Sequence, residues 1–183
     1  MKLYKIYSRA IGLLFALSLL CVGCENEDIL DINDLEISPS NPESVVIVEP
    51  DDGITSVNAL TKAINENGDA TYILRRDGVY YMEGKNVFKH NVVIKAENGS
   101  GKMPIIQPIC DAQGALNADM IRLEGSATFE NIYIIGKDAA TGNLMQRLFR
   151  IDESNVRLKF DNCFIDHCRN FCIRTDNVNN LSE

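Results

Sequence analysis

Three cysteines, a histidine and two arginines lie within one short stretch near the end of the chain. The stretch is FDNCFIDHCRNFCIRTD, and its reactive side chains include Cys163, His167, Cys168 and Cys172. Thiolates and imidazoles are ligands that Zn²⁺ prefers, two thiols can form a disulfide, and a histidine can act as a general acid or base. The stretch is therefore a metal site, a disulfide framework, a catalytic cluster or a set of packed thiols.

The elements that position these residues are short β-strands. After Gly68 the apolar residues recur with a period of two, in runs such as TYIL, NVVIKA, FENIYI and FCIRTD that Gly, Asn, Asp and Ser separate. Before Gly68, the segment ITSVNALTKAINENGD has apolar residues at helical spacing, with Thr55 or Ser56 as its N-cap and Gly68 as its end. The sequence predicts one amphipathic helix followed by an all-β chain.

The strands repeat along the chain. FENIYI at 129–134 and FDNCFI at 160–165 superpose at a spacing of 31 residues, while IRLEG, FRIDE and FCIRTD superpose at 28 and 22. An uneven repeat of this length is typical of a solenoid whose loops vary. Stacked corners would let Asn131 and Asn162 share amide hydrogen bonds. Alternation predicts five core residues: Phe129, Ile132, Ile134, Phe160 and Ile165.

The same alternation separates the three sulfur atoms of the opening stretch. If Phe149 lies above Phe171 in the core, Cys172 faces solvent. Cys163 aligns with an inward position and Cys168 falls in a turn. This favours packed free thiols, with Cys168 to Cys172 as the local disulfide that the spacing allows, over metal ligation. The sequence predicts no metal site and no cofactor, and it does not support calcium.

Outward positions on stacked strands form rows that run from strand to strand. One predicted row holds Arg122, Arg150 and Cys172, and the other holds Glu124, Asp152 and Arg174. Arginine pairs bidentately with carboxylates, so such rows could bind an acidic sugar. Alternating arginines and acids on a solvent face also form ordinary surface ion pairs, worth about 0 to 1 kcal/mol.

The N-terminus has the pattern of an export signal. MKLYKIYSRA carries three bases and no acid, and the thirteen apolar residues that follow are too few to span a membrane, which needs about 20. The segment LCVGC resembles the lipobox of bacterial lipoproteins, although Cys21 stands where leucine is usual. The sequence predicts a lipoprotein signal peptide over residues 1–23 and a lipid anchor on Cys24.

The acidic charge lies mainly after that cysteine. Residues 24–52 hold ten acids and no bases, whereas residues 53–183 hold 16 acids and 15 bases, out of a net charge of −8. The folded part is therefore nearly neutral and has no basic patch for nucleic acid. The segment CENEDILDIND resembles the surface-export signal of outer-membrane lipoproteins in gut Gram-negative anaerobes. We expect an acidic tether over 24–52 and a surface-exposed domain over 53–183.

Several segments resemble the first coils of a known fold. SVNALTKAINENGDATYILRRDGVYY, NVVIKAENGSGKMPIIQP, FENIYIIG and FDNCFIDHC are similar to the start of the right-handed parallel β-helix of the pectate-lyase-like superfamily, including outer-membrane lipoproteins of polysaccharide-utilisation type. The resemblance covers about residues 53–176 and implies an all-β, right-handed parallel β-helix with one capping α-helix. The matched positions are Gly68, Asp69, Asp77, Gly78, Tyr80, Pro104 and Ile105.

The resemblance implies a surface lipoprotein that binds or processes polysaccharide, with an acidic polysaccharide as partner. Arg122, Arg150 and Arg174 are the candidate binding residues, and Arg150, His167 and Arg174 are the candidate catalytic residues. A complete enzyme of this type would be a polysaccharide lyase or a glycoside hydrolase. Because the chain ends just after a coil has begun, we expect a truncated N-terminal part that is inactive alone. A non-catalytic structural or adhesive solenoid is the alternative.

Overall fold

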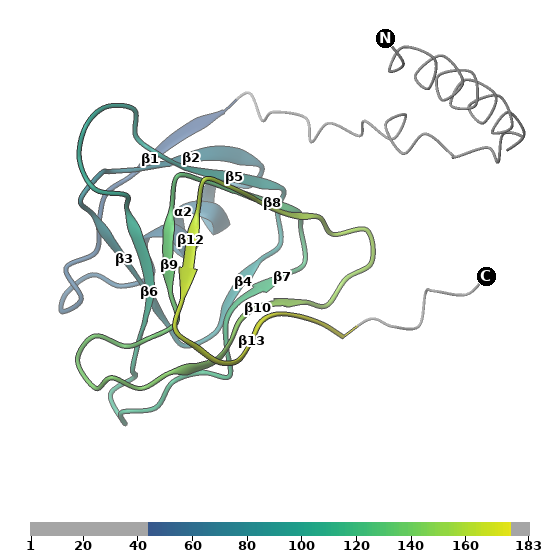
Figure 1. The fold of residues 1–183 in the computed structure, drawn as a ribbon. Helices are drawn as coiled ribbons and strands as arrows, with labels where there is room; N and C mark the ends of the chain where they lie inside the picture. The colour runs from purple at the N-terminus through teal and green to yellow at the C-terminus, as the bar shows by residue number, and fades with distance from the viewer. Residues whose placement is uncertain (1–43, 177–183) are drawn as a thin grey trace, which may run out of the picture. The chain divides into compact units, whose positions relative to one another are not determined.

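The computed structural model describes residues 44–176, which build three β-sheets and one α-helix (Figure 1). The predicted signal peptide, Cys24 and most of the acidic tether lie outside the described residues. No helix within residues 44–176 is long and apolar enough to cross a membrane. In chain order the elements are β1 (Val45–Val48), α2 (Ala59–Asn67), β2 (Ala70–Leu74), β3 (Val79–Glu83), β4 (Asn86–Phe88), β5 (Val92–Ala96), β6 (Ile105–Ile109), β7 (Asp119–Leu123), β8 (Ala127–Glu130), β9 (Tyr133–Ile135), β10 (Met145–Ile151), β11 (Leu158–Asp161), β12 (Phe164–Asp166) and β13 (Cys168–Thr175).

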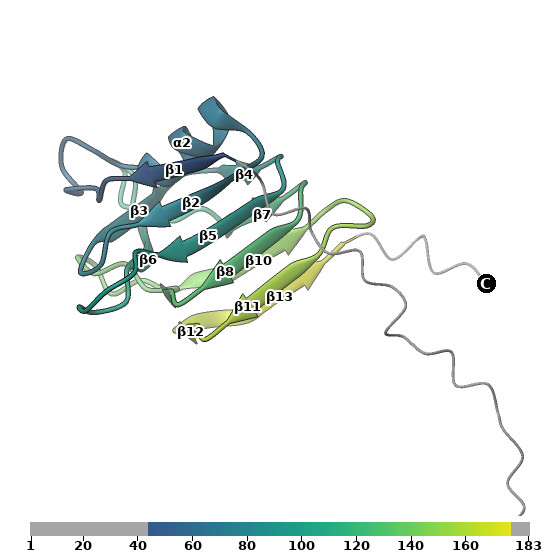
Figure 2. The same ribbon diagram turned by 90° about the horizontal axis from the view of Figure 1, so that it is seen from above.

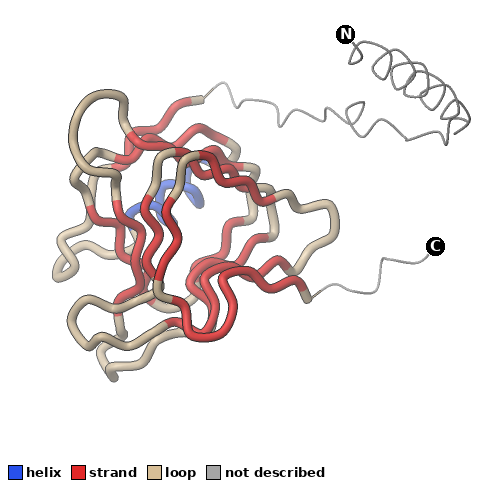
Figure 3. The backbone as a smooth tube through the Cα atoms, in the orientation of Figure 1, coloured by secondary structure: helices blue, strands red, loops and turns tan. Residues whose placement is uncertain are grey.

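From β2 onward, every third strand returns to the same sheet. Strands β1, β2, β5, β8 and β11 form the first sheet, β3, β6, β9 and β12 the second, and β4, β7, β10 and β13 the third. All of these strand pairs are parallel. The chain thus passes along three sides in turn, and we call each such set of three strands a coil (Figure 3). The predicted all-β fold with stacked strands is confirmed.

Aligned side chains from successive coils fill the space between the sheets. In the first sheet, Tyr72, Ile94, Phe129 and Phe160 are register partners from β2 to β11. The first three are fully buried. Phe160 is partly buried because it lies on the last described coil. The predicted inward positions of Phe129, Ile132 and Ile134 are confirmed, and Phe160 and Ile165 pack against the same core.

The first coil forms one end of the stack, and helix α2 covers that end (Figure 2). Leu60 and Ile64 are fully buried against the strands of that coil. Gly68 ends the helix with a φ of 72°, as predicted. The predicted N-cap at Thr55 or Ser56 is wrong, because the helix begins later, after Asn58.

The folded region begins before the predicted boundary at Gly53. Strand β1 pairs with β2, and Val48 is buried. Asp51 is also buried, and its carboxylate accepts hydrogen bonds from the backbone N–H groups of Ala59 and Tyr81 at 3.1 and 3.0 Å. The last residues of the predicted tether, 45–52, therefore belong to the folded region. In the sequence, the VVIV run between prolines indicates the end of the tether and one short first strand, and β1 is that strand.

The corners between sheets are tight and depend on a few residue types. Asn131 and Asn162 have φ angles of 58° and 47°, a left-handed conformation that asparagine tolerates well. The Asn162 side chain donates a hydrogen bond of 2.6 Å to the Asn131 side chain, which confirms the predicted amide pair. At another corner, a Cβ on Gly136 would lie 2.4 Å from the His167 carbonyl oxygen, so only glycine lets these coils approach.

Candidate functional site

The arginine row on the third sheet differs from the predicted one at its last position. Arg122, Arg150 and Arg174 are register partners on β7, β10 and β13. The predicted rows placed Cys172 beside Arg150 and Arg174 beside Asp152, and this is wrong by two residues. Alternation repeats every two residues, so a shift of two leaves the pattern unchanged. A β-bulge in this strand pair adds a further irregularity.

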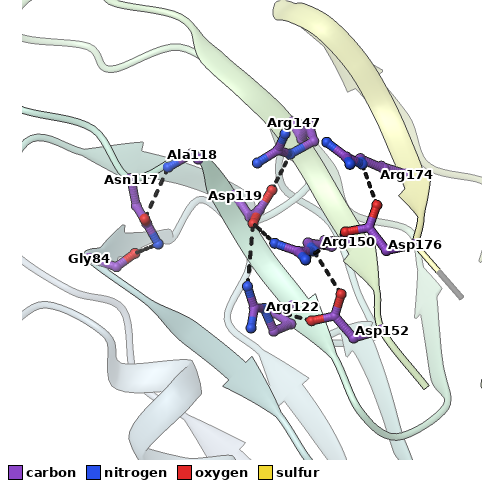
Figure 4. A network of polar contacts seen from close by, with 10 residues as sticks. All are labelled: Gly84, Asn117, Ala118, Asp119, Arg122, Arg147, Arg150, Asp152, Arg174 and Asp176. Carbon is purple, nitrogen blue, oxygen red and sulfur yellow. Dashed lines mark hydrogen bonds and ion pairs between the residues drawn. The ribbon is translucent and has the colours of Figure 1, made fainter.

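Aspartates join these arginines into one network (Figure 4). The Asp119 carboxylate contacts Arg147 and lies 3.6 Å from Arg150 and 3.9 Å from Arg122. Asp152 bridges Arg122 and Arg150 at 2.9 and 2.7 Å. Arg150 also pairs with a third aspartate, Asp176, at 2.6 Å. We call this set the arginine network, and its members are Asp119, Arg122, Arg147, Arg150, Asp152, Arg174 and Asp176.

The arginine network carries four bases and three acids, and its central side chains are largely shielded from solvent. Burial alone would lower the pKa of Arg150, but the charges of Asp152 and Asp176 raise that pKa above its usual value. Arg150 is therefore a permanent cation. A cation of this kind can bind an anion but cannot act as a base near neutral pH.

His167 lies apart from the two arginines with which it was grouped as a catalytic candidate. It precedes the first residue of β13, whereas Arg174 is the penultimate residue of that strand. The His167 Nδ1 atom lies 2.8 Å from an Asp166 carboxylate oxygen. The structure brings Arg150 and Arg174 together with Asp176, and it places His167 at the other end of the strand.

The cysteines of the opening stretch divide into a pair and a single thiol. Cys163 donates a hydrogen bond of 3.3 Å to the Phe129 carbonyl oxygen, and burial raises the pKa of its thiol. Cys168 and Cys172 approach each other, with their sulfur atoms 3.0 Å apart. Within residues 44–176, no group of three or more His, Cys, Asp or Glu side chains is placed to hold a metal ion.

A pocket of about 510 Å³ adjoins the arginine network. Its walls come from the loop 110–118 between β6 and β7, the loop 136–144 between β9 and β10, and the starts of β10 and β13. These two loops occupy the same corner of successive coils, at the lower left of Figure 1. The lining residues are Leu116, Asn117, Ala118, Gly142, Asn143, Leu144, Gln146 and Arg169.

Hydrogen bonds hold the walls of this pocket in place. The Asn117 amide donates to the Gly84 carbonyl oxygen and accepts from the Ala118 backbone N–H, both at 3.0 Å (Figure 4). Asp138 is buried and accepts from the Thr141 backbone N–H at 2.8 Å and from the Cys110 thiol at 3.5 Å. The Cys110 contact links the two loops, so the pocket is largely formed before any ligand binds.

The pocket residues were not among the sequence candidates. Asn143, Gln146 and Arg169 carry no spacing pattern that singles them out. A useful signal was nevertheless present, because 110–118 and 136–144 are two polar loops at matching places of a repeat. Loops on one side of a solenoid often build its binding surface.

No protein-family description matches the chain, and no curated protein matches its sequence. The pocket and the arginine network therefore carry the functional argument.

Proposed function

We propose that this chain belongs to a surface-exposed lipoprotein that binds an acidic polysaccharide. In this proposal the coils belong to a right-handed parallel β-helix of pectate-lyase-like type, and lipidated Cys24 anchors the protein to the outer membrane. The observation that carries the binding function is the preformed pocket beside the arginine network.

The chemistry of the pocket suits a sugar acid. Gln146 and Arg169 are exposed, and Arg169 forms no ion pair within the described residues. Arg169 can pair with a uronate carboxylate, and Gln146 and Asn143 can donate hydrogen bonds to sugar hydroxyls. Leu116 and Leu144 add apolar surface that can contact the C–H groups of a ring.

Binding without cleavage fits these residues best. A lyase needs a base within hydrogen-bond reach of the proton α to the carboxylate. Among the lining residues of this pocket, the one ionisable side chain is that of Arg169. His167 is held by Asp166, and Arg150 and Arg174 are held by aspartates. We therefore expect the purified chain to show no turnover of the polysaccharide.

A second candidate function is that of a structural or adhesive solenoid. The observation that favours it is the internal pairing of the arginine network, in which Asp119, Asp152 and Asp176 already occupy the guanidinium groups. In that case the network would stabilise the third sheet and the pocket would have no acidic ligand.

Titration of the purified chain with polygalacturonate and with neutral dextran tests the proposal. We expect polygalacturonate alone to bind, with affinity that falls as salt rises beyond about 0.1 M, where the screening length is about 10 Å. Arg169→Gln should weaken binding by about tenfold or more, because a charge-assisted hydrogen bond contributes about 1.5 to 3 kcal/mol.

The matched control is Lys159→Gln, which removes an exposed positive charge from β11 on a different sheet. Its affinity should equal that of the unchanged chain within experimental error. Equal affinity of the Arg169→Gln protein and the unchanged chain would rule out the pocket as the binding site. An absence of polygalacturonate binding even at low salt would favour the structural solenoid.

A further inference from the structure

Two thiols on the last described strand lie close enough to react with each other. The sulfur atoms of Cys168 and Cys172 are 3.0 Å apart, although four residues of a straight strand would separate their Cα atoms by about 13 Å. The irregular pairing of β10 and β13 explains this approach. Met145 pairs with Cys168 and Arg147 pairs with Phe171, so β13 carries one extra residue at its start and bends there.

The other two described cysteines have different partners. Cys110 contacts the buried Asp138 carboxylate, and the Cys163 thiol donates to carbonyl oxygens at the core. Cys172 is exposed and Cys168 is partly buried, so a reagent in solution meets Cys172 first. A disulfide has a sulfur–sulfur distance of about 2.05 Å, so bond formation needs an approach of only about 1 Å.

We propose that Cys168 and Cys172 form a reversible disulfide that fixes Arg169 at the edge of the pocket. Arg169 lies inside the short ring that this bond closes, so the bond restricts its backbone. The statement that the pocket is a binding site rests on the proposed function, but the disulfide and its effect on the backbone do not.

The oxidant is a disulfide, either a small molecule or a protein. The thiolate of one cysteine attacks one sulfur of the oxidant and releases the first thiol. The second cysteine then attacks the mixed disulfide and releases the second thiol, which takes up the remaining proton. One disulfide is reduced to two thiols, and two cysteine thiols become one disulfide.

The reaction should be slow near neutral pH and faster in mild alkali. A hydrogen bond with Cys168, together with burial, raises the pKa of Cys172 to about 11, so little thiolate is present at neutral pH. Attack by Cys172 is therefore slow near neutral pH unless an enzyme catalyses the exchange.

Peptide mapping of the full chain tests the bond directly. The reduced protein is incubated with oxidised glutathione at pH 7 and pH 9, alkylated and digested with trypsin. Cleavage after Lys159, Arg169 and Arg174 separates 160–169 from 170–174, because Arg169 lies between the two cysteines. We expect these two peptides to stay joined, with faster joining at pH 9, and to separate after reduction.

Two variants identify the cysteines that take part. Peptide 160–169 contains Cys163 as well as Cys168, so a variant of each is needed. Cys163→Ser should leave the joined peptides unchanged. Cys168→Ser should abolish them. Joined peptides that persist in Cys168→Ser, or free thiols or mixed glutathione disulfides alone in the unchanged chain, would overturn the proposal.

Hydrogen exchange then tests the effect on Arg169. We expect the amides of residues 169–172 to exchange several-fold more slowly in the oxidised protein, whereas those of β5 stay unchanged. Equal exchange in both states would refute the restriction of Arg169. A failure of polygalacturonate binding would instead count against the proposed function and leave this result standing.

Discussion

Phe129 shows how a single side chain joins successive coils. Its ring lies 5.6 Å from that of Phe160, stacked, and 5.4 Å from that of Phe149, edge to face. These are favourable aromatic geometries, each worth about 0.5 to 1.5 kcal/mol beyond the buried area. Phe129 is fully buried and touches two sheets and two coils, so its loss leaves a cavity that neighbouring side chains cannot easily fill.

Truncation of these rings should have unequal effects. Phe129→Ala should lower the free energy of unfolding by about 3 to 5 kcal/mol, the usual range for a buried phenylalanine. Phe160→Ala should cost about 1 to 2 kcal/mol, because its ring is only partly buried. Urea denaturation followed by circular dichroism measures both values. Equal and small losses at the two positions would contradict the stacked register.

The segment between β1 and helix α2 contains two adjacent aspartates, Asp51 and Asp52, whose surroundings are opposite. Burial raises the pKa of Asp51, which caps the helix through the Ala59 N–H. Asp52 is exposed, and hydrogen bonds from the Thr55 hydroxyl and from the backbone N–H groups of Ile54, Thr55 and Ser56 lower its pKa. The fold therefore shifts the pKa values of these two carboxyl groups in opposite directions.

These opposite shifts predict opposite pH dependences. A raised carboxyl pKa gives stability that is present below the usual value of 3.8 and is lost as the pH rises through the folded pKa. Relative to Asp51→Asn, the unchanged chain should therefore become less stable as the pH rises from about 3 to 7. Urea unfolding at a series of pH values measures this difference.

Asp52→Asn provides the comparison of opposite sign. A lowered pKa gives stability that is present above 3.8 and is lost as the pH falls. Relative to Asp52→Asn, the unchanged chain should become more stable over the same rise in pH. Differences that stay constant with pH for both variants would show that neither carboxyl group is perturbed.

Sequence reasoning predicted the elements of this fold better than their register. FENIYI and FDNCFI have the same length and carry asparagine at the same third position, so Asn131 and Asn162 could be aligned correctly. Strand β13 lacks such a marker, because Phe171 and Ile173 satisfy alternation equally well opposite Phe149. The pocket depends on how two loops fold onto each other, and no local pattern specifies that contact.

At the scale of the whole described domain, the two ends of the stack differ. Helix α2 and β1 cover the first coil. At the other end β11, β12 and β13 are each the last strand of a sheet within the described residues. Phe164 and Phe171 there are 62% and 58% exposed, so the last coil buries much less apolar surface than the others.

This difference predicts a gradient of local stability along the stack. We expect backbone amides of β11, β12 and β13 to exchange with solvent at least about tenfold faster than those of β5 and β8, because local opening of the last coil exposes little new core. Hydrogen exchange measured at several protein concentrations checks this and detects any self-association. Uniform protection across all coils would contradict the prediction.

The parallel pairing of coils also determines how the domain would respond to tension. Backbone hydrogen bonds between coils run across the strands and therefore along the direction of stacking. A force that pulls Val45 and Thr175 apart in that direction would load the bonds at one edge first, so strands would detach one after another. Each coil contacts mainly its neighbours, and the domain would lengthen in small successive steps while the remaining coils stay folded.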